Sequence, residues 1–261
     1  MNDNYSHVEE DLFYITENIL GPCDNSVEYE RLQDDFNSVY EHCQCLSICS
    51  VTTCKCLENS CGDNYQVCQD RYKLVSKPNS YPLVECNDIC TCSTECGNRV
   101  VQKGPFEGLD IRICDKGFGL FATSAITAGT FICEYAGEIL TSKQASLRHD
   151  RNRMMGKSNY IFCLRELSGS NTVITIIDPS IFGNIGRYIN HSCDPNSHIL
   201  PVRCGSPIPK LAIFACKDIS VDEEITFHYG LDGTDVVNEN DRIKCLCKAQ
   251  NCRGFIPFQN Y

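Results

Sequence analysis

Cysteine is the residue type that most constrains this chain, because 21 of its 261 residues are cysteines. Eleven of them lie between residues 43 and 96, where apolar stretches are short. Such a segment cannot build a hydrophobic core from its own side chains and needs disulfides or metal ions to hold it together. The first residues, MNDNYSHVEEDLF, are acidic and lack the apolar run of a secretory signal. We therefore expect a reducing compartment, in which clustered cysteines bind metal.

The first cysteine set has a spacing that suits a zinc cluster. It consists of nine residues: Cys43, Cys45, Cys49, Cys54, Cys56, Cys86, Cys90, Cys92 and Cys96. Because nine is odd, disulfides alone would leave one thiol unpaired. Three tetrahedral zinc ions need twelve bonds, and nine thiolates supply twelve if three of them bridge two ions each. We expect a three-zinc cluster here, with Cys61 and Cys68 as the main rivals for its ligands.

A second set stands near the C-terminus, where Cys245, Cys247 and Cys252 follow one another closely. Three ligands on so short a segment require a fourth from elsewhere, and Cys193 in the stretch NHSCDP is our candidate. A zinc ion there would tie the end of the chain to its middle. The two sets together predict about four zinc ions. The odd number of cysteines in the first set argues against a disulfide-rich secreted protein.

The charge is concentrated at the N-terminus. The net charge is −11, and ten acidic residues and one arginine lie within the first 40 residues. We expect these residues to form a solvated acidic leader. The rest of the chain has no basic block that would indicate direct binding to the DNA backbone, and a modestly acidic surface favours a basic partner. No stretch of 18 uninterrupted apolar residues occurs, so we expect no membrane span.

The apolar pattern predicts a strand-rich body. Residues 12–20 fit a strand or a short helix equally well, and Gly21-Pro22 ends either. From about residue 110, short β-branched and aromatic runs alternate with turn residues, which is typical of many short strands. The stretch from Thr141 to Lys157 predicts a short helix capped by Thr141 or Ser142. Residues 231–244 are polar and predict a loop.

Between the two cysteine sets lie the segments NRVVQKG, CEYAGE, FGNIGRYINHSC and PKLAIFACKDI. With the cysteine spacing, they give a chain that resembles the SET-domain protein lysine methyltransferases over residues 12–261. The resemblance implies a mainly β SET fold with short helices, a β-clip in which the NHSC segment passes under a loop to form a pseudoknot. It also implies an acidic segment at 1–42, a pre-SET zinc module at 43–108, a SET domain at 109–230 and a post-SET tail at 231–261.

The same resemblance implies a binding site for S-adenosylmethionine. Its expected residues are Lys116, Gly117, Phe118, Tyr160, Asn190 and His191. The segment around Phe118 would approach the cofactor with an aromatic ring, although tryptophan is usual at this position of the family. Asn190 and His191 would hold the adenosine end of the cofactor.

Three further residues match positions around the lysine channel of the family: Tyr229, Tyr135 and Phe227. Aromatic walls favour a cationic sulfonium and exclude water, which suits methyl transfer. Tyr229 matches the tyrosine whose hydroxyl lies at the transfer point. Phe227 occupies the Phe/Tyr switch position, which implies di- or trimethylation. His228 stands where the family usually has aspartate, so the local electrostatics differ.

The resemblance implies a histone-lysine methyltransferase that acts on the histone H3 tail or another basic, lysine-containing peptide. The pre-SET spacing favours lysine-9 of histone H3, and the SET segments leave lysine-36 open. The alternative is a SET-fold binding module that acts as a chromatin scaffold with little turnover. A monomer in the nucleus, on chromosomes, is the expected context.

Overall fold

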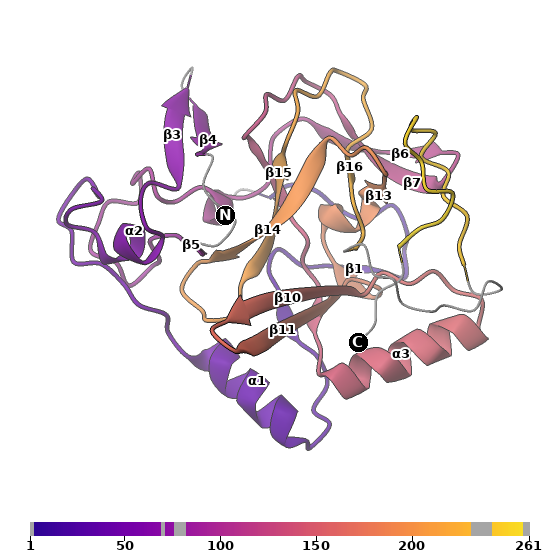
Figure 1. Ribbon diagram of the computed structural model, residues 1–261, viewed down its shortest axis with the longest axis horizontal. Helices are drawn as coiled ribbons and strands as arrows, with labels where there is room; N and C mark the ends of the chain where they lie inside the picture. The colour runs from indigo at the N-terminus through magenta and orange to yellow at the C-terminus, as the bar shows by residue number, and fades with distance from the viewer. Residues whose placement is uncertain (1–2, 69–70, 76–81, 231–241, 258–261) are drawn as a thin grey trace.

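The computed structural model describes residues 3–68, 71–75, 82–230 and 242–257. Two four-stranded sheets form its centre (Figure 1). The first sheet has the order β5-β14-β15-β8, comprising Leu83–Val84, Ser197–Arg203, Lys210–Ala215 and Phe131–Glu134. The second has the order β10-β11-β9-β2, comprising Phe162–Ser168, Asn171–Asp178, Glu138–Ile139 and Ile19–Leu20. The expectation of a mainly β fold with short helices is confirmed.

The remaining strands form pairs. Two pairs are antiparallel hairpins: β3 with β4, Tyr65–Cys68 and Arg71–Leu74, and β6 with β7, Leu109–Cys114 and Gly117–Ala122. Two pairs are parallel: β1 with β12, Phe13–Tyr14 and Phe182–Gly183, and β13 with β16, Asn190–His191 and Thr226–Phe227. The helices are α1, α2 and α3, with short 3-10 turns η1 and η2: Val27–Asn37, Lys55–Asn59, Ser142–Met154, Val101–Lys103 and Ile185–Tyr188.

The pairing of β13 with β16 positions the candidate site. Parallel neighbours need a long connection, and here β14 and β15 lie between the two strands in the chain. Asn190 pairs with Thr226 and His191 with Phe227. The NHSC segment therefore lies directly beside the ITFHY segment, as the pseudoknotted β-clip requires.

The main hydrophobic core lies behind this pair. It collects fully buried side chains from β7, β15, η2 and β16, among them Leu120, Ile213, Ile185 and Phe227. These aliphatic and aromatic side chains exclude water from the inner face of the site, and the hydrophobic effect is the main force that holds the two sheets together.

The helix expected after residue 141 is confirmed as α3. The Thr141 side chain accepts a hydrogen bond from the backbone N–H of Gln144, and the Gln144 side chain accepts one from the backbone N–H of Thr141, which together form a capping box. Arg148 on this helix lies 2.6 Å from Glu138 and 2.8 Å from the fully buried Asp178. The helix is thereby attached to β9 and β11, the two inner strands of the second sheet.

The acidic N-terminus is not a solvated leader, so this expectation is wrong. The stretch 12–20 forms β1 and β2, and each pairs in parallel with a strand of the SET core. On α1, Tyr29 is buried and donates a hydrogen bond to the carbonyl oxygen of Gly21. Most of the acidic side chains are exposed, but Asp3, Glu9 and Asp24 are half-buried. Most of the polar loop expected at 231–244 lies outside the described residues. Within the described residues, no helix is long and apolar enough to cross a membrane.

Candidate zinc sites and active site

The nine cysteines of the first set come together in one buried cluster. Eight of them belong to groups of four whose sulfur atoms lie within 4.8 Å of one another, and Cys43 belongs to three such groups. The ninth, Cys96, is buried in the same cluster. The sulfur atom of Cys86 lies 3.9 Å from that of Cys43 and 3.6 Å from that of Cys49. A cysteine that belongs to more than one of these groups can bridge two zinc ions.

These distances fit zinc and not disulfides. Five pairs of sulfur atoms in the cluster are 3.6–3.9 Å apart, whereas a disulfide bond is about 2.05 Å long. Four thiolates around a tetrahedral zinc ion with bonds of about 2.3 Å would lie about 3.8 Å apart. All 21 cysteines are free of disulfides. Cys61 is exposed and Cys68 lies on β3; neither belongs to a ligand group.

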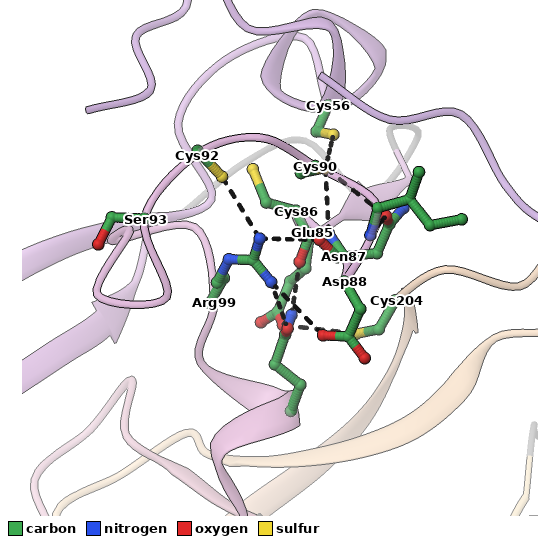
Figure 2. A network of polar contacts seen from close by, with 12 residues as sticks. Cys56, Glu85, Cys86, Asn87, Asp88, Cys90, Cys92, Ser93, Arg99 and Cys204 are labelled. Carbon is green, nitrogen blue, oxygen red and sulfur yellow. Dashed lines mark hydrogen bonds and ion pairs between the residues drawn. The ribbon is translucent and has the colours of Figure 1, made fainter. Parts of the chain in front are cut away.

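A buried arginine beside the thiols supports the same assignment (Figure 2). The side chain of Arg99 is 6% exposed, and its Nη2 donates to the carbonyl oxygen of Asn87 at 2.7 Å and to the sulfur of Cys92 at 3.5 Å. Nine thiolates with three zinc ions carry a net charge of about −3. A buried guanidinium needs a negative partner. The Asp88 carboxylate lies 3.8 Å from Nη1 but is exposed, and a zinc–thiolate cluster would supply a buried negative charge. Glu85 secures the next turn by accepting hydrogen bonds from the backbone N–H groups of Val100 and Val101.

The second cysteine set also comes together as expected. Cys193, Cys245, Cys247 and Cys252 form one group with sulfur atoms within 4.8 Å of one another, and the first two sulfur atoms are 3.9 Å apart. The sulfur of Cys193 also lies 3.5 Å from Nε2 of His191. The C-terminal segment is therefore connected to the NHSC segment, and a zinc ion held there would fix the position of β13.

Three of the expected cofactor residues meet at one point. The Lys116 ammonium lies 2.6 Å from a carboxylate oxygen of Glu224. The Asn190 amide donates to the other Glu224 oxygen at 2.9 Å and to the carbonyl oxygen of Phe118 at 3.0 Å. Gly119 leaves room for this contact, because a Cβ atom there would lie 3.0 Å from Glu224 and 3.2 Å from Asn190. The Glu224 carboxylate thus links β13 to the β6–β7 hairpin.

Sequence reasoning missed Glu224. Its carboxylate joins Lys116 on the β6–β7 turn to Asn190 on β13, although the three residues are far apart in the chain. In the sequence it stands in the acidic turn DEE before the ITFHY strand, which is the ordinary composition of a solvated turn. The one feature of the sequence that pointed to a role for Glu224 is its position three residues before Phe227.

The expected channel residues form an aromatic cluster. The ring of Phe227 lies 4.9 Å from that of Tyr229 and 5.9 Å from those of Tyr135 and Phe162, measured between centroids. The Tyr135 hydroxyl donates to the carbonyl oxygen of Tyr160 at 2.6 Å. Phe162 was also missed, although it follows Tyr160 by two residues, the period at which an extended chain repeats a face.

Tyr229 is held from two sides. Its hydroxyl donates to the carbonyl oxygen of Ile189 at 2.9 Å, and its backbone N–H donates to Nδ1 of His191 at 3.2 Å. Burial raises the pKa of the Tyr229 hydroxyl above its ordinary value, so the group stays protonated at neutral pH. Burial also lowers the pKa of His228, whose ring lies 4.9 Å from that of His191. The unusual histidine is therefore uncharged at neutral pH.

Comparison with known proteins agrees with this geometry. The SET domain family matches residues 117–230. The probable histone-lysine N-methyltransferase set-23 of Caenorhabditis elegans is 42% identical over 232 residues, which cover 86% of this chain and 91% of that protein. The chain belongs to the SET-domain histone-lysine N-methyltransferases. It is therefore an enzyme that takes methyl groups from S-adenosylmethionine, and its cysteine groups are suited to zinc.

Other members of the family cover the whole fold. The human histone-lysine N-methyltransferase SETMAR is 35% identical over 261 residues, which cover 95% of this chain and 36% of that longer protein. The crystal structure of its methyltransferase domain matches with a TM-score of 0.78 at 33% identity, covering 99% of this chain and 93% of that one. KRYPTONITE, solved with DNA, an H3(1-15) peptide and SAH, matches with a TM-score of 0.74 at 25% identity, covering 98% and 50%. The SET-domain resemblance expected from the sequence is confirmed.

Proposed function

We propose that this SET-domain enzyme di- or trimethylates a lysine of the histone H3 tail, with lysine-9 the preferred position, and that it acts as a monomer on nuclear chromatin. The observation that carries the proposal is the aromatic cluster beside the Asn190–His191 strand, in which Tyr135 and Phe227 are buried and Phe162 and Tyr229 are half-buried. We propose the working boundaries 1–42, 43–108, 109–230 and 231–261 for the N-terminal segment, pre-SET, SET and post-SET parts.

Two observations favour lysine-9 over lysine-36. The nine-cysteine pre-SET set is complete and clustered, and its spacing resembles that of the histone H3 lysine-9 enzymes. KRYPTONITE was solved with a peptide of the first fifteen residues of H3, a stretch that contains lysine-9 and not lysine-36. A basic peptide also suits a chain with a net charge of −11.

The cofactor is proposed to lie over the contact between β7 and β13. When bound, S-adenosylmethionine would supply the methyl group of its sulfonium to a neutral lysine amine and leave as S-adenosylhomocysteine, and the methylated amine would give its extra proton to solvent. Lys116, Gly117 and Phe118 would approach it with backbone and ring, while Asn190 and His191 hold its adenosine end. Burial lowers the pKa of His191 to about 4, so this ring is uncharged at neutral pH. Tyr160, whose backbone carbonyl accepts the Tyr135 hydroxyl, would complete the wall of the cofactor site.

The channel residues are proposed to orient the lysine and exclude water. Tyr229 stays protonated, and its O–H donates a hydrogen bond to the carbonyl oxygen of Ile189. The lone pairs of its oxygen therefore remain available at the proposed transfer point. A fixed oxygen dipole in a buried site stabilises the positive charge that develops on the amine. Tyr135 and Phe227 provide aromatic faces that favour a cationic methylammonium over water. The apolar surroundings also lower the pKa of the target lysine toward its nucleophilic neutral form.

Replacing Phe227 by tyrosine is expected to shift the product from di- and trimethyl-lysine to monomethyl-lysine. Phe227 is 2% exposed and is enclosed by three aromatic rings. In the proposed channel, an added hydroxyl would lie beside the target amine. It would hydrogen-bond the amine or a water molecule and occupy the space of a methyl group. The first transfer needs neither that space nor a rotation of the amine. Peptide masses followed over time would measure the product ratio.

The matched control is Phe13→Tyr, which adds the same hydroxyl to a residue of β1 that is 60% exposed. Its product ratio is expected to equal that of the parent. An unchanged ratio in Phe227→Tyr at equal overall turnover would mean that this side chain does not line the channel.

The position of the target lysine can be tested with two substituted peptides. H3 peptides in which lysine-9 or lysine-36 is replaced by arginine should be incubated with enzyme and methyl donor. Loss of product only with the lysine-9 replacement is expected. Loss only with the lysine-36 replacement would assign the other lysine, while leaving the enzyme class as it is.

A further inference from the structure

The first described residues lie against the SET core in an alternating pattern. Tyr5, His7 and Glu9 are half-buried, whereas Val8 and Glu10 between and beside them are exposed. This period of two is that of an extended chain with one face packed on a surface. The Tyr5 hydroxyl anchors the segment by donating to the carbonyl oxygen of Phe106 at 2.7 Å.

Glu9 makes two charged or polar contacts with the η2 turn. One carboxylate oxygen lies 3.1 Å from Nη1 of Arg187. The other accepts a hydrogen bond from the Tyr188 hydroxyl, which also lies 2.9 Å from Nδ1 of His7. Burial and this carboxylate raise the pKa of Tyr188 to about 12. The segment thus contacts the last two residues of η2, which are separated from β13 by Ile189 alone.

Arg187 is buried, and Glu9 is its carboxylate partner among the described residues. The arginine side chain is 4% exposed, and its Nε donates to the carbonyl oxygen of Pro179 at 3.1 Å. Its guanidinium carbon lies 4.3 Å from the ring centroid of Tyr160 and 5.2 Å from that of Tyr188. Removing one partner of a buried ion pair leaves an uncompensated charge, so the position of Arg187 between two rings depends on Glu9.

The residues that carry these two rings, Tyr160 and Tyr188, are each connected to the proposed cofactor site. The backbone carbonyl of Tyr160 accepts the hydroxyl of Tyr135. The edge of the Tyr188 ring meets Phe118 with centroids 6.1 Å apart. Both Phe118 and Tyr160 are residues proposed to contact the cofactor. Glu9 touches neither of them, yet a single residue separates it from each.

We propose that Glu9 is a positioning residue for the cofactor site. By fixing Arg187 and Tyr188, it holds Tyr160 and Phe118 in the orientation that binds S-adenosylmethionine. The N-terminal segment is thereby a part of the active-site architecture. The inference rests on the proposed cofactor roles of Phe118 and Tyr160.

The test compares Glu9→Gln with Glu10→Gln in the full chain. Glutamine keeps the size of the side chain and an acceptor for Tyr188, but it removes the charge that faces Arg187. The dissociation constant of S-adenosylhomocysteine, measured by calorimetry, is expected to rise about tenfold in Glu9→Gln, as the loss of one charge-assisted contact implies. The kcat at saturating methyl donor should stay within about twofold of the parent. Glu10→Gln, the exposed neighbour, should match the parent in both.

If Glu9 had a purely structural role, Glu9→Gln would lower the thermal midpoint of unfolding and leave the dissociation constant of S-adenosylhomocysteine unchanged. Equal dissociation constants in Glu9→Gln and Glu10→Gln would overturn the proposal. A parent protein that does not bind S-adenosylhomocysteine would instead overturn the proposed function, and the inference with it. Tyr188→Phe provides a second test if Glu9→Gln folds poorly, because it keeps the ring beside Phe118 and removes the hydroxyl that Glu9 accepts. It should also weaken binding, and unchanged binding would count against the proposal.

Discussion

Tyr229→Phe is expected to lower kcat by about 10²–10³-fold, the cost of losing one positioned polar group from a water-excluded site. The hydroxyl is fixed by the carbonyl oxygen of Ile189 at 2.9 Å, and its raised pKa keeps it protonated. Phenylalanine preserves the ring and its 4.9 Å packing against Phe227, so the channel should keep its shape. The affinity for S-adenosylhomocysteine should change little. Initial rates with an H3 peptide, together with calorimetry, measure both quantities.

Tyr72→Phe is the matched control, since Tyr72 lies on β4 of the pre-SET hairpin, outside the aromatic cluster. Its kcat should equal that of the parent. If Tyr229→Phe keeps a rate near that of the parent while Tyr72→Phe does the same, the assignment of the transfer point to Tyr229 is wrong.

Cys43→Ser is expected to remove the pre-SET zinc cluster and prevent stable folding of residues 43–96. Cys43 belongs to three of the possible ligand groups, so its loss should affect more than one ion. Structural zinc contributes about 10–16 kcal/mol in small metal-dependent domains, which equals or exceeds the stability of about 5–15 kcal/mol of a whole domain. The parent should contain about four zinc ions per chain, and the variant one or none. Metal analysis by mass spectrometry and thermal unfolding measure the two effects.

Cys61→Ser is the matched control, because Cys61 lies in the same module, is exposed and belongs to no ligand group. It should retain the zinc content and the thermal midpoint of the parent. A Cys43→Ser protein with an unchanged zinc content would contradict the proposed cluster.

The second zinc site gives a separate effect. Cys252→Ser should lose one ion while the pre-SET cluster stays loaded, because the two ligand groups share no residue. It should also weaken cofactor binding, since its partner Cys193 is two residues from His191.

Local and compositional signals predicted much of this structure. The ligand spacing of both cysteine sets identified them before any contact was known, because metal ligands are recognised by residue type and spacing. The α3 helix was predicted from Thr141, whose capping box with Gln144 depends only on residues three apart. By contrast, residues 12–20 fitted strand and helix equally well, because β1 and β2 are two residues long and exist only through pairing with β12 and β9.

The contacts that join distant segments could not be predicted in the same way. Glu224, Arg187 and Glu9 look like ordinary charged surface residues in the sequence, and their roles depend on partners that only the fold brings near. The N-terminal acidic run illustrates the point: composition indicates a solvated leader, while the alternation of half-buried and exposed residues shows a packed one. Composition records how many charges a segment has and not which face they occupy.

The most direct test of the central claim is a mass spectrum of an H3 tail peptide after incubation with the enzyme and S-adenosylmethionine. The account predicts mass increments of two or three methyl groups on one lysine, and none with Tyr229→Phe over the same time. A parent protein that binds the cofactor but adds no methyl group to any histone peptide would contradict the account and identify a SET-fold binding module instead.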